Sequence, residues 1–170
     1  MSRSLLFWIG AAVLLFWAVG AYNRLVGLRG ALLRSFAAVD EQFRRRHRLL
    51  EQLADALDAS RAEPDPSLAA LRAACTQLDA AFGHARAKPT AAELMTSLKL
   101  AEAILGEARQ KLPAPGDAAP LHTELAAGDT TLAFAREQFN AKVQAYNDAV
   151  RQFPTWLIAG MFGFHRAGTW

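Results

Sequence analysis

The side chains best suited to chemistry are scattered along this 170-residue chain, and their spacing argues against a catalytic or metal site. We expect no histidine to be paired with another metal ligand three or four positions away, the arrangement by which one helix usually holds a metal ion. The sequence also lacks an HExxH motif, a glycine-rich phosphate loop and a GxSxG motif. We therefore predict no catalytic residue, no metal site and no cofactor, and expect a protein that is not an enzyme. The histidines are His47, His84, His122 and His165.

The single cysteine, Cys75, excludes an intramolecular disulfide, as is usual for a protein of a reducing compartment. It lies on the apolar stripe of a helical pattern, among Leu71, Leu78 and Phe82. Free cysteines in such positions usually behave as small hydrophobic side chains. We expect Cys75 to be buried and not to act as a nucleophile.

A basic run, RRRHR at residues 44–48, interrupts the apolar stripe of its helix. Contact with lipid is disfavoured, because Arg46 lies about 36 Å along the helix from Tyr22 and charges act over about 8 Å at physiological salt. Nucleic acid is also disfavoured, since the run has no interleaved aromatic residues and the net charge of the chain is only +3. We predict a structural ion pair in which Arg45 or Arg46 meets Asp129 on the returning helix.

An apolar stretch near the N-terminus predicts a membrane anchor. Residues 4–23 carry no charge, and as a helix they span about 30 Å, the thickness of the hydrocarbon core. The alternative is a cleavable secretory signal that ends near residues 18–20. The length of the stretch favours retention, and so does the helical pattern that continues beyond it. Arg24, Arg29 and Arg34 follow the span, so the positive-inside rule places the N-terminus outside and the rest in the cytoplasm, as in a single-pass protein of the inner membrane.

The remainder of the chain has helical periodicity throughout and predicts an all-α protein. Proline-containing breaks at residues 61–67, 88–90 and 113–120 divide it into four segments. We expect Asp65 to cap the second segment and Thr90 with Glu93 to form a capping box for the third. Asp129, after Gly128, leaves open a kink or a late start in the fourth. The fold expected is a transmembrane helix that continues into an antiparallel bundle of two long and two short helices.

The domain boundaries follow from these patterns. Residues 1–23 form the anchor, residues 24–153 the cytoplasmic helical bundle, and residues 154–170 an apolar, aromatic tail.

The expected helix lengths predict self-association. The first and last helices of the bundle would be about 58 and 50 Å long, and the middle pair about 30 Å each. The middle pair would then cover only the distal half, which leaves apolar side chains near the membrane uncovered and available for a homo-oligomer interface. These side chains are Leu25, Leu28, Leu32, Val143, Tyr146 and Val150.

Two interpretations of the tail stay open. Its aromatic residues are of the kind found at a membrane interface, although residues 153–164 are too few to span a bilayer. The tail could equally fold back as a hook onto the bundle. The aromatic residues are Trp156, Phe162, Phe164 and Trp170.

Two separated motifs resemble the opening and closing signatures of the LemA family. The opening motif is YNRLVGLR at residues 22–29 with VDEQFRRRHRLL at 39–50, and the closing motif is REQFN at 136–140 with Tyr146-Asn147 and residues 153–164. The chain departs from the family pattern at Phe36, Glu51, Asp129-Thr130 and Phe139. The resemblance implies one N-terminal membrane segment, a cytoplasmic helical bundle, no established enzymatic activity and an association with membrane-protein quality control beside membrane metalloproteases.

Together these observations predict a membrane-anchored scaffold that self-associates and contacts lipid, with a membrane protease as a partner and no nucleic acid. The alternative is a lipid-binding or membrane-shaping protein that acts through its C-terminal aromatic segment.

Overall fold

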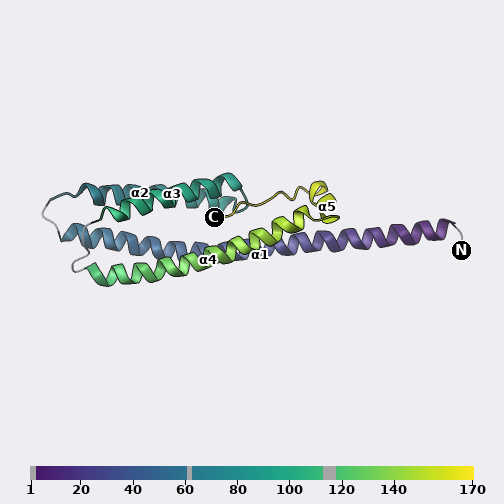
Figure 1. Cartoon of the computed structure of the whole chain (residues 1–170), viewed down its shortest axis with the longest axis horizontal. Coiled ribbons are helices and arrows are strands. Elements are labelled where there is room, and N and C mark those ends of the chain that lie inside the picture. Colours follow the sequence, from purple (N-terminus) through teal and green to yellow (C-terminus); the bar gives the residue numbers. More distant parts are fainter. Residues whose placement is uncertain (1–2, 61–62, 113–117) are drawn as a thin grey trace.

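The computed structural model describes residues 3–60, 63–112 and 118–170, and within these residues it contains five helices and no strand (Figure 1). The all-α expectation is confirmed. The helices are α1 (Arg3–Ala59), α2 (Pro66–Ala87), α3 (Ala92–Gln110), α4 (Ala119–Arg151) and the short α5 (Thr155–Met161). The fifth helix was not expected from the sequence.

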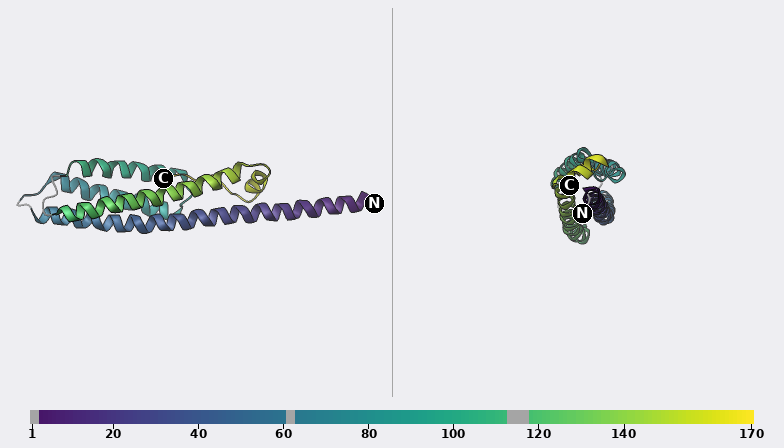
Figure 2. Two further views of the ribbon diagram at one scale, coloured as in Figure 1. Left: turned by 60° about the horizontal axis from the view of Figure 1, so that its bottom comes forward. Right: turned by 90° about the vertical axis from the view of Figure 1, so that its right-hand side faces the viewer.

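Helix α1 is a single unbroken helix of 57 residues, about 86 Å long, that passes without interruption across the predicted boundary at residue 23. Its N-terminal part extends beyond the other helices (Figure 2), and the large apolar side chains from Leu5 to Phe16 are exposed. This part is long and apolar enough to cross a membrane. The C-terminal part of the same helix forms one side of the bundle core.

The helix ends confirm one capping prediction and correct another. Asp65 caps α2, where its carboxylate accepts a hydrogen bond of 2.8 Å from the backbone N–H of Ser67, and Pro66 is the first helical residue. The capping box at Thr90 is wrong, because α3 begins after Ala91 and that N-cap makes no side-chain bond. Thr90 lies just outside the helix, where its carbonyl accepts a hydrogen bond from the N–H of Gly168.

Helix α4 runs continuously through Gly128, so a late start at Asp129 is wrong. The hydroxyls of Thr130 and Thr131 donate to the carbonyls of Ala126 and Ala127 four residues earlier. These polar side chains therefore bond back to their own helix rather than ending it.

The helices form two packed pairs. Helix α1 lies against α4, helix α2 pairs with α3 as a hairpin, and the hairpin covers the end of the first pair that is far from the N-terminus (Figures 1 and 2). Aromatic rings join the pairs: Phe43 stacks on Phe82 at 3.9 Å, and Phe36 contacts both Phe82 and Phe139. All four rings are buried. The core thus holds the hairpin to the long helices through residues of α1, α2 and α4.

The prediction of an uncovered apolar stripe near the membrane is wrong. Leu25, Leu32, Val143 and Tyr146 are buried within one copy of the chain. Leu28 and Val150 are partly buried and pack against the same core. The reason is that α1 and α4 pack against each other beyond the hairpin and the C-terminal segment folds back over them. These residues therefore give no support to a homo-oligomer interface.

The C-terminal segment divides into an exposed and a buried part. Trp156 and Phe162, on and next to α5, are 50% and 59% exposed. Phe164 and Trp170 are buried, so their prediction as membrane-interface residues is wrong. For these two residues the alternative interpretation, a tail that folds back onto the bundle, is correct. Their burial follows from the path of residues 164–170, which run back along the bundle (Figure 1).

Candidate functional site

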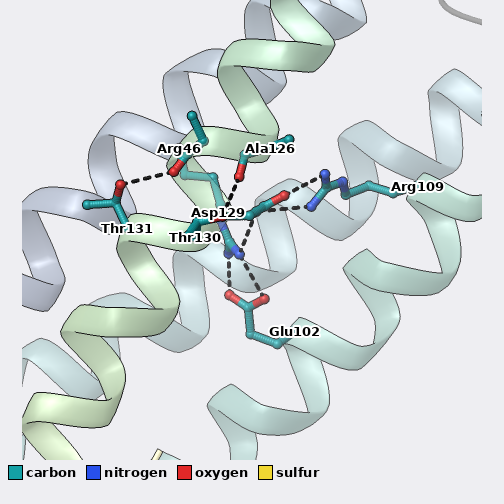
Figure 3. Close-up of polar contacts among 8 residues, drawn as sticks. Arg46, Glu102, Arg109, Ala126, Asp129, Thr130 and Thr131 are labelled. Atoms are coloured by element: carbon teal, nitrogen blue, oxygen red, sulfur yellow. Dashed lines mark hydrogen bonds and ion pairs between the residues drawn. The ribbon is translucent and has the colours of Figure 1, made fainter.

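Charged side chains from three helices converge on Arg46 in the distal half of the bundle (Figure 3). The guanidinium of Arg46, on α1, donates two hydrogen bonds to the two carboxylate oxygens of Glu102 on α3. Its Nη1 also lies 3.6 Å from Oδ1 of Asp129 on α4. The side chain of Arg46 is only 7% exposed, so the paired carboxylates offset the cost of removing its charge from water.

Asp129 is shared between two arginines. Besides Arg46 it accepts two hydrogen bonds, of 2.8 and 3.2 Å, from Arg109 near the end of α3. Arg45 does not join this cluster; it lies 3.6 Å from Glu124, and both of these side chains are more than half exposed. The structure thus brings Arg46 and Asp129 together and turns Arg45 elsewhere.

Sequence analysis missed Glu102 and Arg109. The stripe of α3 places Ala101 and Leu105 in the core, and Glu102 lies beside them at the edge of that face. Glu102 lies at the edge of the apolar stripe of α3, and Arg46 lies within the apolar stripe of α1. These two positions are a sequence signal from which the pair could have been predicted. The cluster joins α1, α3 and α4 through charge. Both carboxylates are paired with a guanidinium, and only the buried Nε of Arg46 lacks a hydrogen-bond partner. This pairing of opposite charges suits a structural role rather than proton transfer.

A second ionic contact joins α1 to the hairpin. Asp40 accepts hydrogen bonds from Arg86 on α2 and from Arg44 on its own helix. Burial by itself raises the pKa of the Asp40 carboxyl, but the hydrogen bonds and charges of Arg86 and Arg44 outweigh it and lower the pKa below its ordinary value of 3.8. Asp40 is therefore ionised at neutral pH and supports the α1–α2 contact there.

The C-terminal segment is held by two asparagines of α4 that bind its main chain. Asn147 donates to the carbonyl of Ala167 and accepts from the N–H of the same residue, at 2.9 and 2.8 Å. Asn140 makes the same pair of bonds to the main chain of Trp170. Seven helical residues and three extended residues both cover about 10 Å, so the two asparagines match the spacing of the extended chain.

Further contacts fix this segment against α2, α3 and α4. The hydroxyl of Tyr146 donates to the carbonyl of His165 at 3.0 Å. Gly168 passes so close to α3 that a Cβ placed on it would lie 2.5 Å from Cα of Ala92. The buried indole of Trp170 meets the edge of Phe82, 5.8 Å between ring centroids. Asn140 and Asn147 lie seven positions apart in the closing motif. This spacing is the sequence signal from which their contact with the C-terminal segment could have been predicted.

Cys75 lines a pocket together with His47, Glu51 and Arg72. Burial, with a smaller effect from the charge of Glu51, raises the pKa of its thiol to about 11. Nε2 of His47 lies 3.5 Å from the carboxylate of Glu51, four positions away, so the expectation that no histidine has such a neighbour is wrong. Among the described residues no group of three or more His, Cys, Asp and Glu side chains could hold a metal ion.

Cys75 is expected to react slowly with thiol reagents in the folded protein. At pH 8 a thiol with a pKa of about 11 is about one-thousandth thiolate, and burial slows the reaction further. The measurement is the rate of reaction with Ellman's reagent, with and without urea. The matched control is Cys75→Ala/Thr76→Cys, which moves the thiol to the adjacent exposed position. Equal rates for the two folded proteins would contradict the assignment of Cys75 to the core.

The fold and the contacts define a class: an all-helical protein in which one long helix, apolar at its N-terminal end, continues into a bundle closed by its own C-terminal segment. The model of the LemA family matches residues 35–170, which include most of the bundle, the second half of the opening motif and the whole closing motif. The chain belongs to the LemA family. No curated protein matches it, and no solved structure does.

Proposed function

We propose that this protein is a non-enzymatic, single-pass membrane protein that presents its helical bundle to partners at the cytoplasmic face of the inner membrane. The observation that carries the proposal is the continuity of α1, which joins a stretch long and apolar enough to cross a membrane to one side of the bundle core. Because no loop separates the two, the bundle is attached rigidly to its anchor. Arg24, Arg29 and Arg34 support the cytoplasmic orientation.

The partner surface lies on the exposed faces of α3 and α4. Leu100 and Phe134 are large apolar side chains of the bundle that are 63% and 62% exposed, and they stand well away from the apolar end of α1. Single exposed apolar residues are common on protein surfaces. Leu100 and Phe134 serve here as positions at which a crosslinker can capture a partner. A membrane protease is the kind of partner that the family resemblance implies, and a second copy of the chain is the other partner to be tested.

The second candidate function is lipid binding or membrane shaping by the C-terminal aromatic segment. Exposed Trp156 and Phe162 favour it. Phe164 and Trp170 do not, because both are covered by the bundle. The part of the segment available to lipid is thus confined to α5 and its flanks.

The test is photo-crosslinking in intact membranes. A photoreactive amino acid placed at Phe134 or at Leu100 is expected to give a discrete adduct with a membrane protein, whereas the same group at exposed Lys99 is the control for random collision. An adduct of twice the mass identifies self-association. The proposal fails if the protein separates with the soluble fraction, or if Phe134 and Leu100 give no adduct beyond the control.

The orientation is tested in the same cells with an impermeant thiol reagent. In a Cys75→Ala background, Ser2→Cys is expected to be labelled from outside and Thr76→Cys only after the cells are opened. Labelling of Thr76→Cys in intact cells would reverse the orientation.

A further inference from the structure

Among the described residues beyond the N-terminal part of α1, exposed large apolar side chains gather on α5 and its flanks. We call this surface the α5 patch, and its residues are Phe153, Trp156, Leu157, Met161 and Phe162. They are between 43% and 77% exposed. The opposite face of α5 is used for packing, since Thr155, Ile158 and Ala159 are buried. The helix is thus amphipathic with respect to the bundle, and its free face is large, aromatic and apolar.

The position of α5 along α1 places this patch at the end of the apolar stretch. Arg24 donates a hydrogen bond to Gln152, the residue just after α4, so α4 ends near the level of Arg24. Beyond that level α5 continues the packing against α1 (Figure 1). The ring of Phe162 lies 5.0 Å from that of Tyr22, and Trp17 is partly buried against the core. Tyr22 and Trp17 both belong to the uncharged stretch.

Exposed arginines surround this level. Arg24 and Arg29 follow the apolar stretch on α1, Arg151 ends α4, and Arg166 follows the patch in the C-terminal segment. Aromatic and apolar side chains next to exposed arginines are the composition of a helix that lies in the headgroup region of an anionic bilayer.

We propose that the α5 patch is a second membrane contact, which lies in the lipid leaflet on the side of the bundle and takes anionic phospholipid as its ligand. The proposal rests on the anchor described under the proposed function and adds the position of α5. If residues 4–23 cross the bilayer, Tyr22 lies at its boundary. The contact between Tyr22 and Phe162 then brings α5 to the same boundary, where lipid covers the patch.

The experiment measures the depth of three spin labels on the full-length protein in vesicles of phosphatidylethanolamine and phosphatidylglycerol. In a Cys75→Ala background, labels are placed by Met161→Cys in the patch, Leu14→Cys in the span and Phe134→Cys on the bundle. These positions are matched, since their side chains are 77%, 65% and 62% exposed. Oxygen concentrates in lipid and a nickel chelate stays in water, so the ratio of the two accessibilities reports lipid contact.

The label at Met161 is expected to show an oxygen-to-nickel ratio about threefold or more above that at Phe134, since an interfacial helix sinks about 5–10 Å into the leaflet. Leu157→Cys repeats the measurement should Met161→Cys fail to fold by circular dichroism. Equal ratios at Met161 and Phe134, with a lipid-exposed Leu14, overturn the contact and leave the anchor intact. A label at Met161 shielded from both reagents shows that protein covers the patch, which also overturns it. Water exposure at Leu14 overturns the anchor itself.

Discussion

Glu102→Ala is expected to lower the free energy of unfolding by about 3 kcal/mol, because it leaves the buried guanidinium of Arg46 with only the more distant Asp129 as a partner. Arg46 is 7% exposed at its side chain and Glu102 18%, so little water is present to replace the lost carboxylate. The measurement is urea unfolding of the full chain in mild detergent, followed by circular dichroism.

The matched control is Glu124→Ala, which breaks the exposed pair with Arg45 and should cost about 0.5 kcal/mol or less. The double variant Arg46→Met/Glu102→Leu removes both charges and is expected to lie closer to wild type than Glu102→Ala does. Additive losses in a double-mutant cycle on Arg46 and Glu102 would show that the two side chains do not interact.

Gly168→Ala is expected to release the C-terminal segment from its contacts with α3 and α4. The added Cβ would lie 2.5 Å from Cα of Ala92, and a backbone atom of α3 cannot move aside as the end of a flexible side chain does. Loss of the buried indole of Trp170 then costs about 3 kcal/mol. The measurements are urea unfolding and the rate of tryptic cleavage after Arg166, identified by mass spectrometry.

The control for Gly168→Ala is Gly106→Ala. A Cβ at Gly106 on α3 meets nothing within 4 Å, so this variant should keep its stability or gain up to about 1 kcal/mol from helix propensity. Unchanged cleavage after Arg166 in Gly168→Ala would show that the close approach to Ala92 does not hold the segment.

Apolar periodicity was enough to predict the four long helices and their order, because each stripe that buries a face recurs every three or four residues. Asp65 with Pro66 could be placed from local rules, since both act within one turn. The path of residues 164–170 could not be predicted in this way. It depends on Asn140 and Asn147, which bind main chain and therefore impose no side-chain pattern on the segment they hold.

The same limit explains the error about the membrane-proximal stripe. Helix lengths underestimated the reach of the hairpin, since Thr90 lines the same pocket as Arg29 and Tyr146. They also contain no information about the other segments that cover Leu25 and Val143. These apolar side chains are covered by the direct packing of α1 on α4 and by the C-terminal segment, which folds back over the bundle. In the ionic cluster, Arg46 and Asp129 were placed from helix register, whereas Glu102 required the tilt of the hairpin against α1, which register alone does not define.

The unbroken course of α1 makes the protein a lever. The 36 residues from Arg24 to Ala59 form an arm about 54 Å long that is one piece with the apolar stretch. A change of 20° in the tilt of that stretch, which is within the range that membrane helices adopt as bilayer thickness varies, would carry the far end of the bundle sideways by about 18 Å. If the apolar stretch crosses a membrane as proposed, a small change in the lipid bilayer becomes a displacement at Ala59 comparable to the width of two helices.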